Sequence, residues 1–218
     1  MPLNLNPVES RILGCLLEKE RTVPETYPLS LNALVAACNQ TTARDPVSAY
    51  DQKTVEDGIF TLRDKKLATV IFGSGSRVQK YRHNLPEHYN LDRPDIAVLC
   101  VLLLRGPQTA GELRSRTERI FHFATLEELE TCLESLVRGD APLLKLLPQQ
   151  PGQKERRYVQ LFSAEPEGGW QTGTADPAPT RSAPEPGKIE ALETEVAALR
   201  AEIAALAAQF ADFRKQFE

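Results

Sequence analysis

The chain of 218 residues is 41% hydrophobic and 26% charged, with a formal net charge of −4, values typical of a globular protein with one or two small domains. No stretch reaches the roughly 18 consecutive apolar residues that a membrane-spanning helix needs. The first six residues lack the basic and apolar regions of a signal peptide. We therefore expect a cytoplasmic protein with no membrane partner.

The charge divides unevenly along the chain. Residues 1–93 carry 12 Lys and Arg against 11 Asp and Glu, residues 94–163 carry 9 against 9, and residues 164–218 carry 5 against 10. The two front sections are nearly neutral, so they lack the strong basic character that usually marks nucleic-acid binding. A local basic stripe remains compatible with these totals.

The first part of the chain carries the signals of three helices. Asn6-Pro7-Val8-Glu9 predicts a helix start, because Asn caps helices, Pro is tolerated at the first position and Glu favours the positive end. Residues 24–28 predict an extended connection, after which Ser30 and Asp51 cap a second and a third helix. Helical spacing predicts that these residues lie on the buried faces: Val8, Ile12, Cys15, Leu16, Leu31, Leu34, Val35, Cys38, Val55, Ile59 and Leu62.

The period then changes from helical to strand-like. Residues 68–72 and 78–83 predict two strands, and Gly73-Ser74-Gly75-Ser76 between them predicts the turn of a β-hairpin. Three helices followed by a hairpin is the element order of a winged helix-turn-helix domain, which we assign to residues 1–92.

The same order is predicted a second time. Residues 94–105 predict a helix that is apolar nearly all round and must be buried on several sides. Capping boxes that begin at Thr109 and Thr125 start two further helices, and residues 143–147 and 157–162 predict another hairpin. We assign residues 93–163 to a second winged-helix domain. Its helices should point these side chains inward: Leu113, Leu126, Leu129, Leu133 and Leu136.

The predicted fold class is therefore mainly α with small β-hairpins (α+β), in two tandem winged helix-turn-helix domains plus a C-terminal coiled-coil helix. Residues 164–187 are rich in Pro, Gly, Ala, Thr and Glu, which predicts a flexible linker. Residues 188–218 form the predicted coiled coil.

The coiled coil is predicted by an apolar seam whose spacing alternates between three and four residues. β-branched residues at heptad position a with Leu at position d favour a parallel two-stranded coil. The parallel dimer would also pair opposite charges between the two chains, Lys188 with Glu193 and Glu195 with Arg200. The alternative is one amphipathic helix that folds back on its own domains. The seam residues are Ile189, Leu192, Val196, Leu199, Ile203, Leu206, Phe210, Phe213 and Phe217.

Several motifs resemble the YceH-like family of bacterial proteins. The first set comprises Tyr27-Pro28-Leu29-Ser30-Leu31-Asn32-Ala33-Leu34, then Ala37-Cys38-Asn39-Gln40 and Arg44-Asp45-Pro46-Val47. The second set comprises Arg93-Pro94, Gly106-Pro107-Gln108-Thr109 and Glu112-Leu113-Arg114. The resemblance covers residues 7–162, with a looser match in the Leu-rich coil. It implies tandem winged helices and supplies no catalytic residues.

No catalytic, cofactor or metal site is predicted. The histidines, His83, His88 and His122, have no carboxylate or Cys at metal-ligand or triad spacing. The glycines of the predicted hairpin do not precede a helix, as a phosphate-binding loop would require. Four well-separated cysteines among aliphatic residues predict buried thiols rather than disulfides or a zinc site: Cys15, Cys38, Cys100 and Cys132. We expect a protein that is not an enzyme.

Two functions of different class remain open. In the first, a dimeric protein, a candidate transcriptional regulator, binds double-stranded DNA with the third helix in the major groove and the hairpin on the backbone. Acidic residues on that helix, Glu56, Asp57 and Asp64, argue against this. In the second, the winged helices form a scaffold that binds an unidentified protein. The candidate nucleic-acid-binding residues are Asn39, Arg44, Gln52, Lys53, Thr54, Arg77, Lys80 and Arg82.

Overall fold

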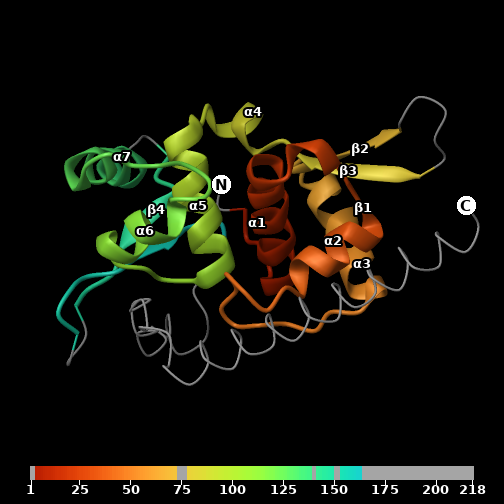
Figure 1. Ribbon diagram of the computed structural model, residues 1–218, viewed down its shortest axis with the longest axis horizontal. Helices are drawn as coiled ribbons and strands as arrows, with labels where there is room; N and C mark the ends of the chain where they lie inside the picture. The colour runs from red at the N-terminus through yellow and green to blue at the C-terminus, as the bar shows by residue number, and fades with distance from the viewer. Residues whose placement is uncertain (1–2, 73–77, 139–140, 150–152, 164–218) are drawn as a thin grey trace, which may run out of the picture. The chain divides into compact units, whose positions relative to one another are not determined.

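The computed structural model describes residues 3–72, 78–138, 141–149 and 153–163, all of which belong to one compact unit (Figure 1). Over these ranges the protein combines seven α-helices with two small antiparallel sheets, which confirms the predicted α+β class. The predicted linker and coiled-coil helix, residues 164–218, lie outside the described residues, as does the hairpin turn. No helix among the described residues is long and apolar enough to cross a membrane.

The first three predicted helices are confirmed as α1 (Pro7–Thr22), α2 (Leu31–Cys38) and α3 (Gln52–Asp64). Asn6 caps α1 reciprocally, because its side chain accepts from the Glu9 N–H at 2.9 Å while the Glu9 carboxylate accepts from the Asn6 N–H at 2.7 Å. Of the residues predicted inward, Val8, Leu31 and Val35 are half-buried. The others are buried, namely Ile12, Cys15, Leu16, Leu34, Cys38, Val55, Ile59 and Leu62.

The first sheet has three strands rather than the predicted two. Its order is β1 (Leu29–Ser30), β3 (Gln79–His83), β2 (Ala68–Phe72), with every pair antiparallel. The predicted extended connection before α2 is wrong in its first part, because Pro24–Thr26 forms a 3-10 helix. Two-residue β1 is too short to show alternation, and it forms because its backbone pairs with a strand about 50 residues later in the chain.

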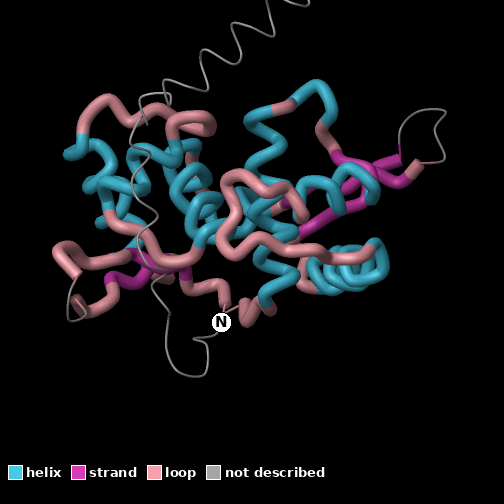
Figure 2. The backbone as a smooth tube through the Cα atoms, turned by 60° about the horizontal axis from the view of Figure 1, so that its bottom comes forward, coloured by secondary structure: helices cyan, strands magenta, loops and turns pink. Residues whose placement is uncertain are grey.

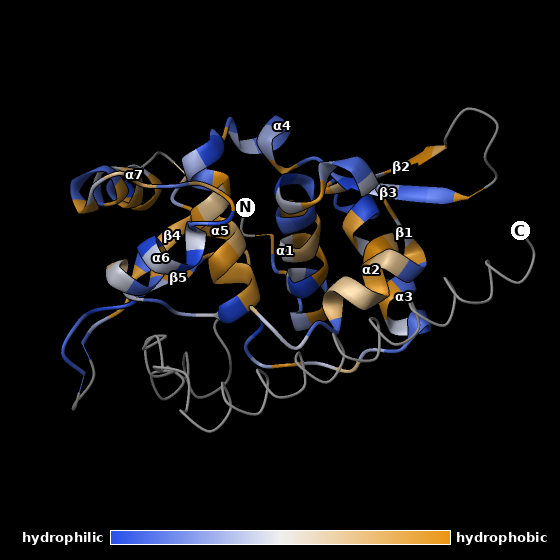
Figure 3. Ribbon diagram, in the orientation of Figure 1, coloured by the Kyte–Doolittle hydropathy of each residue, from blue (hydrophilic) through white to orange (hydrophobic). Residues whose placement is uncertain are grey.

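Helix α4 (Leu85–Tyr89) follows the first hairpin, and helix α5 (Arg93–Arg105) begins the second half of the unit. The short α4 is not predicted from the sequence, whereas α5 confirms the apolar helix. Helix α5 is buried on nearly all sides, and Figure 3 shows that most of the helix is hydrophobic. It lies beside α1, and the Cys100 thiol donates to the Gly14 carbonyl across this joint at 3.4 Å. The two halves therefore share one core.

The second half contains α6 (Ala110–Thr117), α7 (Leu126–Arg138), β4 (Leu144–Leu146) and β5 (Tyr158–Gln160). Most of the predicted inward residues are buried: Leu113, Leu129, Leu133 and Leu136. The prediction for Leu126 is wrong, since this first residue of α7 is 37% exposed and precedes the turn that meets the core. The capping box predicted at Thr125 is confirmed in one half, because the Thr125 hydroxyl accepts from the Glu128 N–H at 3.2 Å. In the other half the Glu128 carboxylate accepts from the Ala124 N–H, at 2.8 Å, instead of the Thr125 N–H.

The two halves have the same strand arrangement. In the first, β1 pairs with the second strand of the hairpin, β3. In the second, an isolated antiparallel bridge joins Gln108 to Tyr158, again in the second strand of the hairpin. Each half is thus a helix, a short extended segment, two helices and a hairpin. The repeat extends to a third extended segment beside the hairpin, which no local sequence pattern indicates.

A long loop between α2 and α3 reaches the second half of the unit. Figure 2 shows it as an extended run without helix or strand. The Asp45 N–H of this loop donates to the Leu104 carbonyl at the end of α5, at 2.9 Å. Three of the cysteines, Cys15, Cys38 and Cys100, are buried free thiols as predicted, and Cys132 is half-buried.

Candidate macromolecular interface

Helix α3 presents one side to the core and the other to solvent. Gln52 and Lys53, predicted to contact DNA, are exposed in its first turn, and Thr54 is half-buried. The backbone N–H of Thr54 donates to the capping carboxylate of Asp51 at 2.7 Å, and hydrogen bonds from Thr54 lower the pKa of Asp51. The first turn therefore carries a fixed negative charge beside the predicted contacts.

The exposed side of α3 is acidic overall. From Asp51 to Asp64 the chain has four carboxylates against two cations. Lys53 lies 2.7 Å from the Asp57 carboxylate, whose hydrogen bond and charge raise the pKa of Lys53. An arriving phosphate would thus meet a lysine whose charge is already balanced, next to unbalanced carboxylates.

The hairpin separates the predicted cations from α3. Side chains alternate between the two faces of a strand, so Tyr81 and Gln79 share one face of β3 whereas Lys80 and Arg82 lie on the other. The Tyr81 face is the buried one, since Tyr81 and His83 are 2% and 4% exposed, and α3 packs against the neighbouring strand β2. Burial, followed by the charge of Glu56, raises the pKa of Tyr81. Arg82 forms an ion pair with Glu87 at 3.1 Å. The predicted Arg77 lies outside the described residues.

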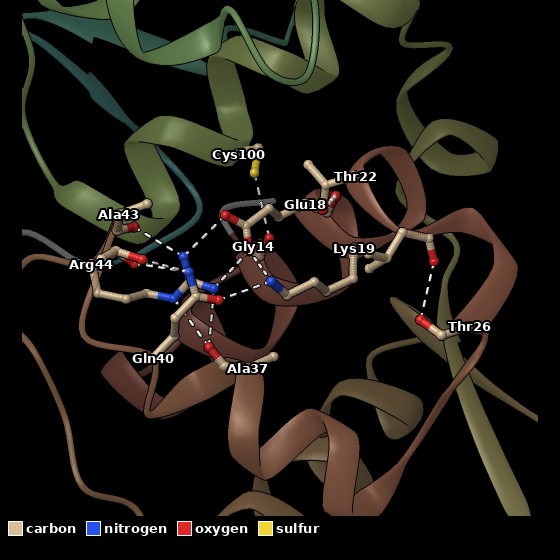
Figure 4. Close-up of polar contacts among 12 residues, drawn as sticks. Gly14, Glu18, Lys19, Thr22, Thr26, Ala37, Gln40, Ala43, Arg44 and Cys100 are labelled. Carbon is tan, nitrogen blue, oxygen red and sulfur yellow. Dashed lines mark hydrogen bonds and ion pairs between the residues drawn. The ribbon is translucent and has the colours of Figure 1, made fainter. Parts of the chain in front are cut away.

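Two of the predicted contact residues are used inside the fold. The Asn39 amide exchanges two 2.7 Å hydrogen bonds with the backbone of Tyr50. Arg44 is fully buried and binds the Glu18 carboxylate at 2.7 and 3.2 Å and the Ala37 carbonyl, as Figure 4 shows. We therefore leave both residues out of the candidate interface.

Exposed aromatic side chains at α3 and the hairpin were not singled out by sequence reasoning. Phe60 is 41% and Phe72 64% exposed. The Phe60 ring stacks under the Arg63 guanidinium, 5.3 Å from the ring centroid. Phe72 ends β2 and pairs with Gln79, on the Tyr81 face. Side chains alternate between the two faces of the strand at residues 68–72, and this alternation indicates that Phe72 lies on the inward face. Phe72 is at the end of the strand, beyond the core.

These residues form what we call the α3–hairpin face, composed of Glu56, Phe60, Arg63, Phe72 and Gln79. The three α3 residues are spaced by four and three positions, which places them on one side of the helix. Both Glu56 and Arg63 act electrostatically on Tyr81 of the hairpin. The face therefore combines two exposed aromatic rings with one charge of each sign.

No metal site accompanies this face in the part of the chain that the structure describes. Within those ranges, no three His, Cys, Asp or Glu side chains converge in a way that could hold a metal ion.

Comparison with known proteins identifies the family. A family model described as "Protein of unknown function, DUF480" matches residues 5–153. A UPF0502 protein of Geotalea daltonii is 51% identical over 219 residues, which cover 100% of both chains. Another, of Citrifermentans bemidjiense, is 52% identical over 219 residues, again 100% of both. That of Opitutus terrae is 52% identical over 176 residues, 80% of this chain and 75% of the relative. The YceH name suggested by the motifs stays a prediction, but the chain belongs to the DUF480/UPF0502 family of bacterial proteins.

Proposed function

We propose that this protein acts by binding rather than by catalysis, and that it is built from two tandem winged helices. The order of helices and strands supports the second point. Each half places two helices before a hairpin and a third extended segment beside the second hairpin strand. That arrangement combines a helix-turn-helix with a β-wing.

We propose further that the α3–hairpin face binds another protein. The observation that carries this proposal is the exposure of Phe60 and Phe72 on a surface whose helix is net acidic. Exposed aromatic side chains at the centre of an interface supply much of its binding energy, whereas carboxylates beside them oppose phosphate. The partner that fits is a protein segment with apolar side chains flanked by Lys or Arg.

A photo-crosslinking experiment tests this proposal. With p-benzoylphenylalanine at Phe72 of the full chain in its native host, we expect a discrete protein adduct, identified by mass spectrometry. The substitution Phe60→Ser should lower the yield of that adduct about tenfold, the loss expected for a hot spot of ~1.4 kcal/mol or more. The matched control carries the same photoreactive residue at Glu130, an exposed position on α7. Equal adducts at Phe72 and Glu130 would rule out a specific face.

DNA binding is the second candidate function, and one observation favours it. Lys80 and Arg82 lie on the outer face of β3, and Arg77 precedes Lys80 by three positions in the sequence. Binding of the full chain to random duplex DNA, measured by fluorescence anisotropy across a salt series, separates the two functions. We expect no steep salt dependence. If binding falls steeply with salt and is lost in Lys80→Ala/Arg82→Ala, the partner is DNA rather than a protein.

Residues 188–218 are proposed to dimerise the chain as a parallel coiled coil, a prediction that rests on the sequence seam. The double substitution Leu199→Asp/Leu206→Asp places charges at two d positions, so the mass measured by light scattering should fall from twice 24.2 kDa to that value. Thr194→Asp, at an outer heptad position, is the control and should stay dimeric. A monomeric wild-type chain would instead favour the helix that folds back on its own domains.

A further inference from the structure

A cavity of about 530 Å³ lies at the joint between the two halves of the unit. Its walls come from the start of α1, the loop between α2 and α3, the end of α5 and the end of β5. This volume lies within the range of small-molecule sites in proteins, roughly 300–1,000 Å³. No sequence pattern indicated it, because its walls are brought together by four segments far apart in the chain.

Arg11 of α1 lines this cavity and is only 5% exposed. One of its terminal nitrogens, Nη2, donates to the Pro46 carbonyl, but Nη1 is buried without any hydrogen-bond partner. Among the described residues Arg11 also forms no ion pair, although Asp45 lines the same cavity. Burial lowers the pKa of the Arg11 guanidinium and the charge of Arg44 acts in the same direction, yet arginine stays protonated in proteins.

The contrast with Arg44 indicates what is missing. Both guanidinium groups are buried in the same half of the unit, and Arg44 has the Glu18 carboxylate as its partner. A buried charge without a counter-ion destabilises a fold unless something compensates it. An anion that enters the cavity would supply to Arg11 what Glu18 supplies to Arg44.

The rest of the lining identifies the kind of anion. Leu102 and Leu103 of α5 and Pro7 of α1 contribute apolar surface, Ser10 and Gln160 contribute neutral polar groups, and the carboxylate of Asp45 belongs to an exposed residue of the lining. One guanidinium beside apolar side chains suits a single carboxylate on an apolar body, whereas a phosphate dianion would need more donors. We propose that this cavity binds a small organic carboxylate, with its carboxylate on Arg11 and its apolar body against Leu102 and Leu103.

Such a ligand would contact both halves at once. Arg11 belongs to the first half, while Leu102 and Gln160 belong to the second. A ligand that binds only the folded joint stabilises it in proportion to its occupancy. The site is separate from the α3–hairpin face and does not depend on the proposed partner there.

The test uses the full chain and a panel of acetate, butyrate, octanoate and benzoate, each compared with its uncharged amide. By calorimetry, we expect at least one acid to bind with a Kd below about 1 mM and its amide at least tenfold more weakly, because a charge-assisted hydrogen bond is lost. Arg11→Met should weaken the binding of that acid at least tenfold, and Arg11→Lys should weaken its binding less. Arg119→Met, at an exposed arginine in the turn after α6, is the matched control and should bind like wild type.

The unfolding temperature of Arg11→Met without ligand separates a ligand-binding role from a structural one. If Arg11 serves the ligand, this temperature should lie within about 3 °C of that of wild type or above it, since the substitution removes an uncompensated charge. If Arg11 only stabilises the fold, the temperature should be lower. The proposal would be overturned if no acid of the panel bound with a Kd below 10 mM, or if an acid and its amide bound equally well. Acid binding that survives both Arg11 substitutions would overturn it too.

Discussion

Arg44→Met should lower the free energy of unfolding by about 3–5 kcal/mol, because it leaves the buried Glu18 carboxylate without its fully buried cation. Arg44 Nη2 lies 2.7 Å from Glu18 Oε2, and the two side chains are 0% and 8% exposed. The guanidinium also donates to the Ala37 and Ala43 carbonyls (Figure 4). The pair thereby fixes the loop after α2 to helix α1. Urea denaturation monitored by circular dichroism measures the loss.

The same substitution should weaken the pH dependence of stability that Glu18 confers. Burial alone raises the pKa of Glu18, but the hydrogen bonds and charges of Arg44 and, after it, Lys19 outweigh this effect, so the net pKa lies below the ordinary 4.5. A carboxyl whose pKa is depressed by folding stabilises the fold above its unfolded pKa, and this contribution is lost as the pH falls through the folded pKa. The stability of the wild-type protein should therefore fall below about pH 4.5. In Arg44→Met only Lys19, 3.2 Å from the Glu18 carboxylate, still opposes the burial effect, so stability should fall less below about pH 4.5 than it does in wild type.

Two controls separate the ion pair from other effects of the substitution. The double variant Glu18→Leu/Arg44→Met removes both buried charges and should recover most of the loss. Lys53→Met breaks an ion pair with Asp57 whose side chains are 79% and 62% exposed, and it should leave stability unchanged within error. An Arg44→Met protein as stable as Lys53→Met would show that Glu18 reaches solvent or another partner.

The elements that could be predicted from the sequence are those set by local signals. The caps Asn6, Ser30 and Asp51 act on backbone groups three residues away, so the starts of α1, α2 and α3 follow from short motifs. Hydrophobic spacing likewise predicts the buried face of each helix. The strand β1 and the bridge at Gln108 have no such signal, because each is held by a partner strand at least 50 residues away.

The candidate site was harder to predict, because a charged residue in a polar loop looks the same whether it faces solvent or a distant carboxylate. Arg44 was expected at the surface, yet its partner Glu18 is 26 residues earlier in the chain. Arg11 was not singled out, since its neighbours in sequence do not reveal the loop and strand that bury it. Phe72 fitted a strand pattern, and only the structure indicates that it extends past the core. Burial of polar residues is a property of tertiary contacts.

Gly14→Leu should destabilise the fold by about 3 kcal/mol, since added side chains in a close-packed core force neighbours from their positions. Even a Cβ at Gly14 would lie 2.8 Å from Leu104 Cδ2 and 3.1 Å from Leu103 Cβ, atoms of a buried helix with little room to move. Gly111→Leu on α6 is the matched control, because a Cβ there meets only Thr109 Oγ1 at 4.0 Å. Replacing a helical glycine without a clash should stabilise by up to about 1 kcal/mol.

The position of Gly14 makes this substitution a test of how the two halves unfold. Gly14 lies on α1 in the first half, whereas Leu103 and Leu104 lie on α5 in the second. If residues 1–92 and 93–163 were independent folding units, Gly14→Leu would leave the unfolding of the second half unchanged. We expect amide hydrogen exchange to accelerate in α7 as well as in α3, because the α1–α5 joint belongs to one core. Faster exchange confined to α3 would mean that the halves are stable separately and that their joint only positions them.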